Sequence, residues 1–433
     1  MPWGITNVNL LINGDLVRNK TIVIDFGNIQ YIGSNEIAGK RYKLEYALDG
    51  KSKLALPGLI NGHTHFCHGS LRGTADNIAL NSWLEKINKY RSNVKKSDIK
   101  VYTNLICLEL IKSGTTAFVS QQNPIYIQEA MKACGKFGIR GVFAPIIIDK
   151  GAVPDKLLSA SYKTFKNFDE LEKICENSRN RLKVVYGPMS LYNCSSELLK
   201  EVSEASITRN NRVHIHLGET KEGAIAIKKK YKMSEVEVLK SIGLLKKTTS
   251  LVHCIHVKDN DLHKIKSADA SIIHCPTSNS KSGDGIAPIS QMLEMGINVG
   301  LGTDGPASNG SQSMLWEMKF AVLLQRVKKN KFPSHKALDM ATINNAKSMG
   351  INDMGSLKIG NKADIVLIDL KAPNMIPWEN VAFHVIYGCN DRNVSDVIVN
   401  GEILLKNQKI LCVDEKKIIN EAIRSLPSET NIL

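Results

Sequence analysis

A short apolar run ends in two histidines at Pro57-Gly58-Leu59-Ile60-Asn61-Gly62-His63-Thr64-His65. Its length and the Pro-Gly pair at its start are typical of a buried β-strand. Side chains two positions apart on a strand point to the same face, so we expect His63 and His65 to enter one cavity. On a helix, two histidines at that spacing would point in different directions. The pair therefore predicts a metal-binding site at the end of a strand.

Three further motifs end or follow apolar runs, at His214-Ile215-His216-Leu217-Gly218-Glu219, Val252-His253-Cys254-Ile255-His256 and Gly302-Thr303-Asp304-Gly305. Eight such runs alternate with helix-length amphipathic segments, and we expect strands at residues 55–66, 115–120, 140–147, 182–187, 212–218, 250–255, 271–275 and 298–303. This alternation predicts an α/β fold, a (β/α)8 TIM-type barrel over residues 54–353. An open doubly wound sheet is the alternative, but the Gly-rich phosphate turn after its first strand is missing here.

The two ends of the chain follow a different pattern. Residues 1–53 and 354–412 contain short strands, expected at 5–12, 21–25, 43–47, 363–369 and 396–405, with turns at Asn13-Gly14 and Asn400-Gly401. Neither end has enough apolar sequence for a core of its own. We therefore expect both ends to combine in one small β-sandwich, and residues 413–433 to form a short helix and a tail.

The four motifs fall at the ends of the first, fifth, sixth and eighth expected strands, and active sites of this fold lie at the C-terminal strand ends. The residues that suit one divalent metal ion, with a position open for water, are His63, His65, His216 and Asp304. Zinc is the ion we expect, with iron or manganese as alternatives. A single buried histidine is usually structural, but four ligands on one rim favour a metal site.

Neighbouring residues suggest how a hydrolysis would proceed at this site. A bound metal lowers the pKa of its water toward about 7. Glu219, just beyond the fifth strand, is expected to carry the water's proton to the leaving group, although a solvated loop carboxylate is the alternative. We expect His253 to orient the water, Asp304 to accept a proton as well as bind metal, and His214 to face the helix layer.

Two other side chains are candidates for contact with a substrate. His274 ends the seventh expected strand and is predicted to form a hydrogen bond near Asp304. Trp83 lies in the region after the first strand, where it either packs or borders the pocket.

The bulk composition limits the class of protein. The formal net charge of +15 would suit nucleic-acid binding, but no basic run is interleaved with aromatic residues, so solvent-facing lysines explain the charge better. The nine cysteines form no Cys-x-x-Cys pair, which favours reduced thiols. Neither a signal peptide nor an apolar run of the roughly 20 residues needed to cross a bilayer is apparent. We expect a cytoplasmic protein with a small-molecule substrate and no nucleic-acid or membrane partner.

With these residues in place, the chain resembles the amidohydrolase superfamily, in the branch of the S-adenosylhomocysteine/methylthioadenosine deaminases and atrazine-type chlorohydrolases. The resemblance runs through Leu56-Pro57-Gly58, Ser113-Gly114-Thr115-Thr116 and Leu357-Lys358-Ile359-Gly360-Asn361-Lys362-Ala363-Asp364. It implies one metal ion on the four ligands above, a proton-carrying Glu219, a strand-six His253 and a homodimer. No lysine stands at Tyr186-Gly187-Pro188, where two-metal members carry a bridging one.

The resemblance implies hydrolytic deamination of an amino-substituted nitrogen heteroaromatic, which is a purine, a pterin or a nucleoside-related compound. Such an enzyme is a hydrolase of carbon–nitrogen bonds in cyclic amidines. One alternative is displacement of chloride or an alkylamine from a triazine-like ring. Another is an inactive barrel that acts as a binding protein, although the complete ligand set argues against it.

The sequence departs from the nucleoside deaminases at three positions. Met189 replaces a ribose-contacting histidine, Ser92 replaces an acidic residue that holds the sugar hydroxyls, and an arginine is missing near Ala144-Pro145. A site without such polar groups gains no discrimination from ribose hydroxyls. We therefore expect a free base, or a ring with a small or apolar substituent, to be preferred over adenosine.

Overall fold

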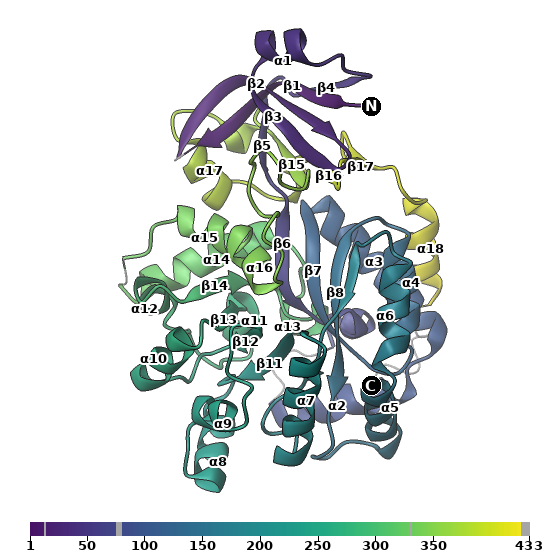
Figure 1. The fold of residues 1–433 in the computed structure, drawn as a ribbon, viewed down its shortest axis with the longest axis vertical. Helices are drawn as coiled ribbons and strands as arrows, with labels where there is room; N and C mark the ends of the chain where they lie inside the picture. The colour runs from purple at the N-terminus through teal and green to yellow at the C-terminus, as the bar shows by residue number, and fades with distance from the viewer. Residues whose placement is uncertain (13, 75–79, 330, 426–433) are drawn as a thin grey trace.

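The computed structural model describes residues 1–12, 14–74, 80–329 and 331–425, apart from the side chains of residues 80–84. Within these residues, parallel strands surrounded by helices form one part, and a sheet built from both ends of the chain forms the other (Figure 1). Among the described residues, no helix is both long enough and apolar enough to cross a membrane.

The parallel strands lie in two sheets, and their bounds are β6 (Leu59–Thr64), β7 (Thr115–Gln122), β8 (Arg140–Ile147), β9 (Leu182–Val184) and β10 (Gly187–Pro188) in one, and β11 (Val213–Leu217), β12 (Thr249–His253), β13 (Ser271–His274) and β14 (Asn298–Leu301) in the other. Backbone hydrogen bonds join the two sheets at both seams. Tyr186 N–H donates to Arg212 O at 3.0 Å, and Asp304 N–H donates to His63 O at 2.9 Å. The fold is therefore TIM-barrel-like, as the alternation of strands and helices predicted.

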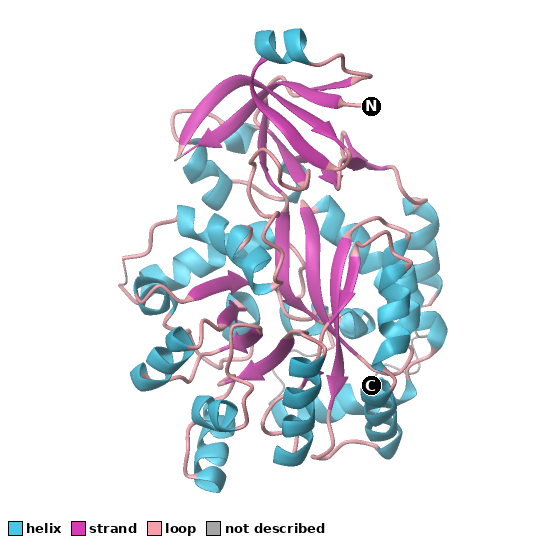
Figure 2. Ribbon diagram, viewed as in Figure 1, coloured by secondary structure: helices cyan, strands magenta, loops and turns pink. Residues whose placement is uncertain are grey.

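Helices cover the outside of these strands (Figure 2). Every residue of β7 and β8 is buried, because helices cover one face of each strand and the barrel interior the other. The helices of the described chain are α1 (Asn35–Arg41), α2 (Leu80–Asn93), α3 (Lys96–Lys112), α4 (Ile127–Gly135), α5 (Asp155–Lys166), α6 (Phe168–Glu176), α7 (Ser196–Thr208), α8 (Lys221–Tyr231), α9 (Glu235–Ser241), α10 (Asp259–Ser267), α11 (Pro276–Lys281), α12 (Ile289–Glu294), α13 (Pro306–Asn309), α14 (Met314–Val327), α15 (His335–Met340), α16 (Ile343–Ser348), α17 (Val381–Tyr387) and α18 (Glu415–Arg424).

The segment expected as one strand over residues 55–66 is two strands in different sheets. β5 (Lys53–Pro57) pairs with β15 (Ile365–Asp369) in the sheet of the chain ends, and β6 begins the barrel. A Cβ atom on Gly58 would lie 2.1 Å from Thr116 Oγ1, so only glycine lets the chain pass here as it changes sheets. The expected strand 182–187 is likewise divided, into β9 and β10.

Strands from both ends of the chain pair in one nine-stranded sheet of the described residues, with β4 beside β1 and the order β18-β17-β16-β15-β5-β1-β2-β3. The remaining bounds are β1 (Trp3–Ile12), β2 (Asp15–Asp25), β3 (Asn28–Ser34), β4 (Ala47–Asp49), β16 (Val394–Val399), β17 (Glu402–Lys406) and β18 (Lys409–Ile410). The two ends combine in one hydrogen-bonded sheet, and this pairing does not confirm the two layers of the predicted sandwich. β3 was not expected, and the strand expected at 43–47 is wrong except for Ala47.

The turn predicted at Asn400-Gly401 joins β16 to β17, with φ of 52° and 74°. Such left-handed values suit a two-residue hairpin turn. Asn13, of the other predicted turn, lies outside the described residues. A buried ion pair fastens the sheet to the barrel: Arg140 Nε donates to Asp364 Oδ2 at 2.6 Å, and Asn400 N–H donates to Asp364 Oδ1 at 2.7 Å.

Candidate metal centre

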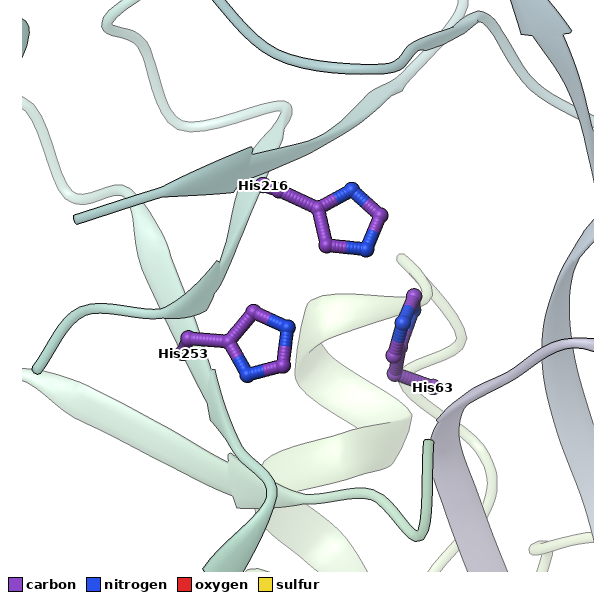
Figure 3. A group of neighbouring side chains, drawn as sticks. All are labelled: His63, His216 and His253. Atoms are coloured by element: carbon purple, nitrogen blue, oxygen red, sulfur yellow. The ribbon is translucent and has the colours of Figure 1, made fainter. Parts of the chain in front are cut away.

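Four histidines and one aspartate meet at the C-terminal ends of the parallel strands, and all five are buried. His63 lies on β6 and His65 directly after it, His216 on β11, His253 at the end of β12, and Asp304 after β14. Figure 3 shows the rings of His63, His216 and His253 turned toward one another, and their ligand atoms lie within 4.8 Å. The structure therefore brings every predicted metal ligand to one point.

Asp304 completes the cluster through its carboxylate. Its Oδ1 lies 3.5 Å from His63 Nε2 and 3.2 Å from His65 Nε2. Ser278 Oγ donates to Oδ2 and Gly305 N–H donates to Oδ1, each at 2.7 Å. These two donors hold the carboxylate in place, with Oδ1 facing the imidazoles.

Hydrogen bonds assign the tautomers of two of these rings. His65 Nδ1 lies 2.7 Å from Gln121 O, and His216 Nδ1 lies 2.9 Å from Met189 O. A carbonyl oxygen can only accept, so each ring carries its hydrogen on Nδ1. The lone pair on Nε2 is therefore available to a metal ion, as in most histidine ligands whose other nitrogen is hydrogen-bonded.

His253 follows the same rule, because its Nδ1 lies 2.8 Å from Asn279 Oδ1. Its Nε2 and that of His63 are buried and have no hydrogen-bond partner among the described residues. A buried nitrogen without a partner is unfavourable unless something binds it. A divalent cation would satisfy both atoms, so the residues present fit a metal ion.

Burial keeps the rings of His63 and His216 neutral at physiological pH. It lowers the pKa of His63 to about 3 and holds the pKa of His216 well below its ordinary value. Removal from water disfavours the charged imidazolium, and a neutral ring is the form that binds a metal.

The backbone is strained at two of the site residues. The φ angle is 73° at His253 and 60° at Asp304, in the left-handed region that residues with a Cβ avoid. Each such residue costs about 1–3 kcal/mol and is typical of functional sites. His253 is the last residue of β12 and Asp304 follows the end of β14, so both strained residues lie where the chain leaves the barrel strands.

Glu219 lies beside His253, with 3.7 Å between its Oε1 and His253 Nε2. Its side chain is 35% exposed, so it is accessible from the mouth of the barrel. Partial removal from water raises its pKa, and nearby acidic groups add to the effect. A raised pKa means that this carboxyl group binds a proton more readily than an ordinary glutamate.

His214 was predicted to face the helix layer, and this is wrong. Its Nε2 lies 2.8 Å from His63 Nδ1, and the two buried rings stack with centroids 5.0 Å apart. His214 and His216 are two positions apart on β11, so they share a face. The same spacing that identified His63 and His65 would have identified this residue.

The predicted substrate contacts have mixed outcomes. Met189 is half-buried, and the hydroxyl of the buried Ser92 donates to Asn88 O within α2. His274 does not bond near Asp304 as expected: it is fully buried, and neither ring nitrogen has a partner among the described residues. The side chain of Trp83 lies outside the described residues.

Arg91 is a buried residue near the site that the sequence did not point to. Its Nη2 lies 2.9 Å from His68 Nε2, and the His68 ring lies 4.7 Å from that of His65. A guanidinium only donates, so His68 Nε2 accepts. The ligand atoms of His65, Cys67 and His68 also lie within 4.8 Å of one another, but the adjacent positive charge disfavours a second cation there.

Comparison with known proteins agrees with this geometry. The model of the amidohydrolase family matches residues 54–404. The chain is 37% identical over 410 residues to a 5-methylthioadenosine/S-adenosylhomocysteine deaminase of Thermoanaerobacter pseudethanolicus, covering 93% of each chain. It is 36% identical over 413 residues to a 5'-deoxyadenosine deaminase of Methanosarcina acetivorans, covering 94% of this chain and 93% of the relative.

Among solved structures, an adenosine deaminase from Xanthomonas campestris with bound zinc superimposes with a TM-score of 0.89. It is 23% identical in sequence, and the match covers 98% of this chain and 97% of the other. The family model covers all of the barrel and the C-terminal strands as far as residue 404, and both relatives match almost the whole chain. The chain therefore belongs to the amidohydrolase family.

Proposed function

We propose that this protein is a metal-dependent hydrolase that removes the amino group from a nitrogen heteroaromatic ring. The observation that carries the proposal is the convergence of four histidines and Asp304 beside Glu219, whose carboxylate lies 3.7 Å from His253. The relatives from Thermoanaerobacter pseudethanolicus and Methanosarcina acetivorans are deaminases of adenosine-type compounds, which supports the same reaction class here.

The residues that would hold the ion are His63, His65, His216 and Asp304, and we propose a single zinc ion. The imidazole and carboxylate set would also accept iron or manganese. When bound, the ion lowers the pKa of coordinated water from 15.7 to about 7 and so provides a nucleophile at neutral pH.

Glu219 is the residue that moves protons in this scheme. The water oxygen bonds to the amino-bearing ring carbon, and Glu219 takes the water's proton and gives it to the ring nitrogen. The amino group then takes the remaining hydrogen of the attacking water, the carbon–nitrogen bond breaks, and ammonia leaves. His253, held by Asn279 through Nδ1, orients the attacking water with its other ring edge.

Ammonia release over a panel of purines, pterins and triazines tests the reaction. Glu219→Gln is expected to lower kcat by about 10²–10⁴-fold with the metal still bound, because the amide cannot relay a proton. Glu222→Gln, at an exposed position of α8, is the matched control and should keep full activity. Normal turnover by Glu219→Gln with metal bound would contradict the proposal, and chloride release in place of ammonia would favour the triazine alternative.

We also propose that the substrate is a free base, or a ring with a small or apolar substituent. Met189 is apolar, and the Ser92 hydroxyl donates its hydrogen to its own helix, so neither side chain offers a ribose a hydrogen-bond donor. The test is kcat/KM for adenosine against free aminopurines and aminopterins. Adenosine preferred by tenfold or more, about 1.4 kcal/mol, would show that other residues hold the sugar.

The proposed organisation of the chain is a catalytic barrel over residues 54–353, a module of residues 1–53 with 354–412, and a C-terminal segment 413–433. The pairing of β5 with β15 supports the composite module. A homodimer is part of the proposal, because symmetric dimers are the commonest assemblies. Light scattering coupled to gel filtration tests it.

A further inference from the structure

Glu317 is a fully buried glutamate on α14 that does not reach the metal centre itself. Its carboxylate accepts two hydrogen bonds, one on each oxygen. Thr277 N–H donates to Oε2 at 3.2 Å, and Asn309 Nδ2 donates to Oε1 at 2.7 Å. Each donor belongs to a segment that touches a residue of the centre.

The first segment is α11, in which Thr277 is the second residue. The next residue, Ser278, donates from Oγ to Asp304 Oδ2 at 2.7 Å. The one after it, Asn279, accepts from His253 Nδ1 at 2.8 Å. By holding the first turn of α11, Glu317 holds the partners of both Asp304 and His253.

The second segment is α13, which begins two residues after Asp304 and ends at Asn309. Asn309 Nδ2 donates to Thr303 O at 2.7 Å as well as to Glu317. Thr303 directly precedes Asp304, whose φ of 60° lies in the strained left-handed region. Glu317 therefore restrains the main chain of Asp304 through Asn309 and its carboxylate through α11.

This position needs a side chain with two accepting oxygens. Both donors are N–H groups, so both oxygens of residue 317 must accept. Glutamine has one accepting oxygen, and its NH2 group would face one of the two N–H donors. An isosteric amide therefore breaks one of the two connections with little change in side-chain volume.

We propose that Glu317 is a positioning residue that holds Asp304 and His253 in the geometry required for metal binding. The inference rests on the metal site of the proposed function but not on the identity of the reaction. Partners that orient metal ligands typically change metal affinity by about 10- to 100-fold when they are removed.

The test compares zinc-loaded wild type with Glu317→Gln and with Asp364→Asn. Asp364 is another buried carboxylate, which accepts three hydrogen bonds, but it lies at the junction with the terminal sheet. Glu317→Gln is expected to weaken zinc affinity by about tenfold or more in chelator competition. It should also shift the visible absorption bands of the cobalt-substituted protein and lower kcat more than it changes KM. Asp364→Asn should lower the melting temperature and leave zinc affinity and cobalt spectrum unchanged.

Wild-type zinc affinity and an unchanged cobalt spectrum in Glu317→Gln would overturn the proposal. So would an equal loss of zinc affinity in Asp364→Asn, since the effect would then reflect general destabilisation. If Glu317→Gln does not fold, Asn309→Ala tests the second connection alone, with the same expected direction and the same overturning result. Zinc affinity and the cobalt spectrum do not depend on ammonia release, so failure of the proposed reaction is distinguishable from failure of this inference.

Discussion

Replacing His214 by phenylalanine tests whether this histidine supports the metal centre. His63 Nδ1 lies 2.8 Å from His214 Nε2, and the two residues are 0% and 3% exposed. When His63 Nε2 binds a metal, the hydrogen must stay on Nδ1, and phenylalanine leaves that N–H without an acceptor. An unpaired buried donor costs about 1–3 kcal/mol. Without the metal the hydrogen can move to Nε2, which faces Asp304, so the penalty falls on the metal-bound state.

At 1.4 kcal/mol for each factor of ten, this penalty corresponds to a zinc affinity weaker by about 5- to 150-fold. The assay is competition for zinc with a chelator of known affinity, together with circular dichroism to confirm folding. His214→Gln retains an accepting oxygen and is expected to recover most of the affinity. His263→Phe, at an exposed position of α10, controls for the general effect of the substitution. Folded His214→Phe protein with the affinity of His263→Phe would refute the reasoning.

Three further predictions concern stability. Removing the metal by chelation is expected to lower the melting temperature and added zinc to restore it, since an ion at 1,000 times its Kd stabilises the native state by about 4.1 kcal/mol; a melting temperature insensitive to chelator would contradict a metal site. Burial raises the pKa of Glu235 to about 7, from 4.5, so the folded state binds this proton more tightly and stability falls as pH rises from 4.5 through 7. The variant Glu235→Gln cannot ionise at this position. Its free energy of unfolding, measured in urea, should therefore exceed that of wild type by about 1–3 kcal/mol at pH 8 and by much less at pH 5. An equal difference at both pH values would contradict the assignment. Arg140→Met leaves the charge of Asp364 without its ion-pair partner in the junction. The free energy of unfolding in urea should fall by about 3–5 kcal/mol, with no change in kcat of the folded enzyme. A loss below 1 kcal/mol would show that the pair is weak.

The barrel and the position of its site follow from short-range patterns in the sequence. Apolar runs of strand length alternate with amphipathic segments, and each candidate ligand stands at the end of such a run. Strand ends share one rim in this fold, so His63, His216 and Asp304 could be expected together although they are far apart in the chain. The i and i+2 rule was sufficient for His65, and applied consistently it would also have assigned His214 to the site.

Other features depend on contacts that no local pattern reports. The run at residues 55–66 is continuous in apolar character, but β5 leaves the barrel because β15, more than 300 residues later, offers it a pairing edge. Glu317 reads in sequence as one polar position of a helix. Its role emerges only when α11 and α13 bring Thr277 and Asn309 to its two oxygens. Periodicity in the sequence reports which face of a helix or strand is buried. It does not report which group will form a hydrogen bond with a buried polar side chain. Each buried polar group needs such a partner, and the packing of distant segments decides which one it receives.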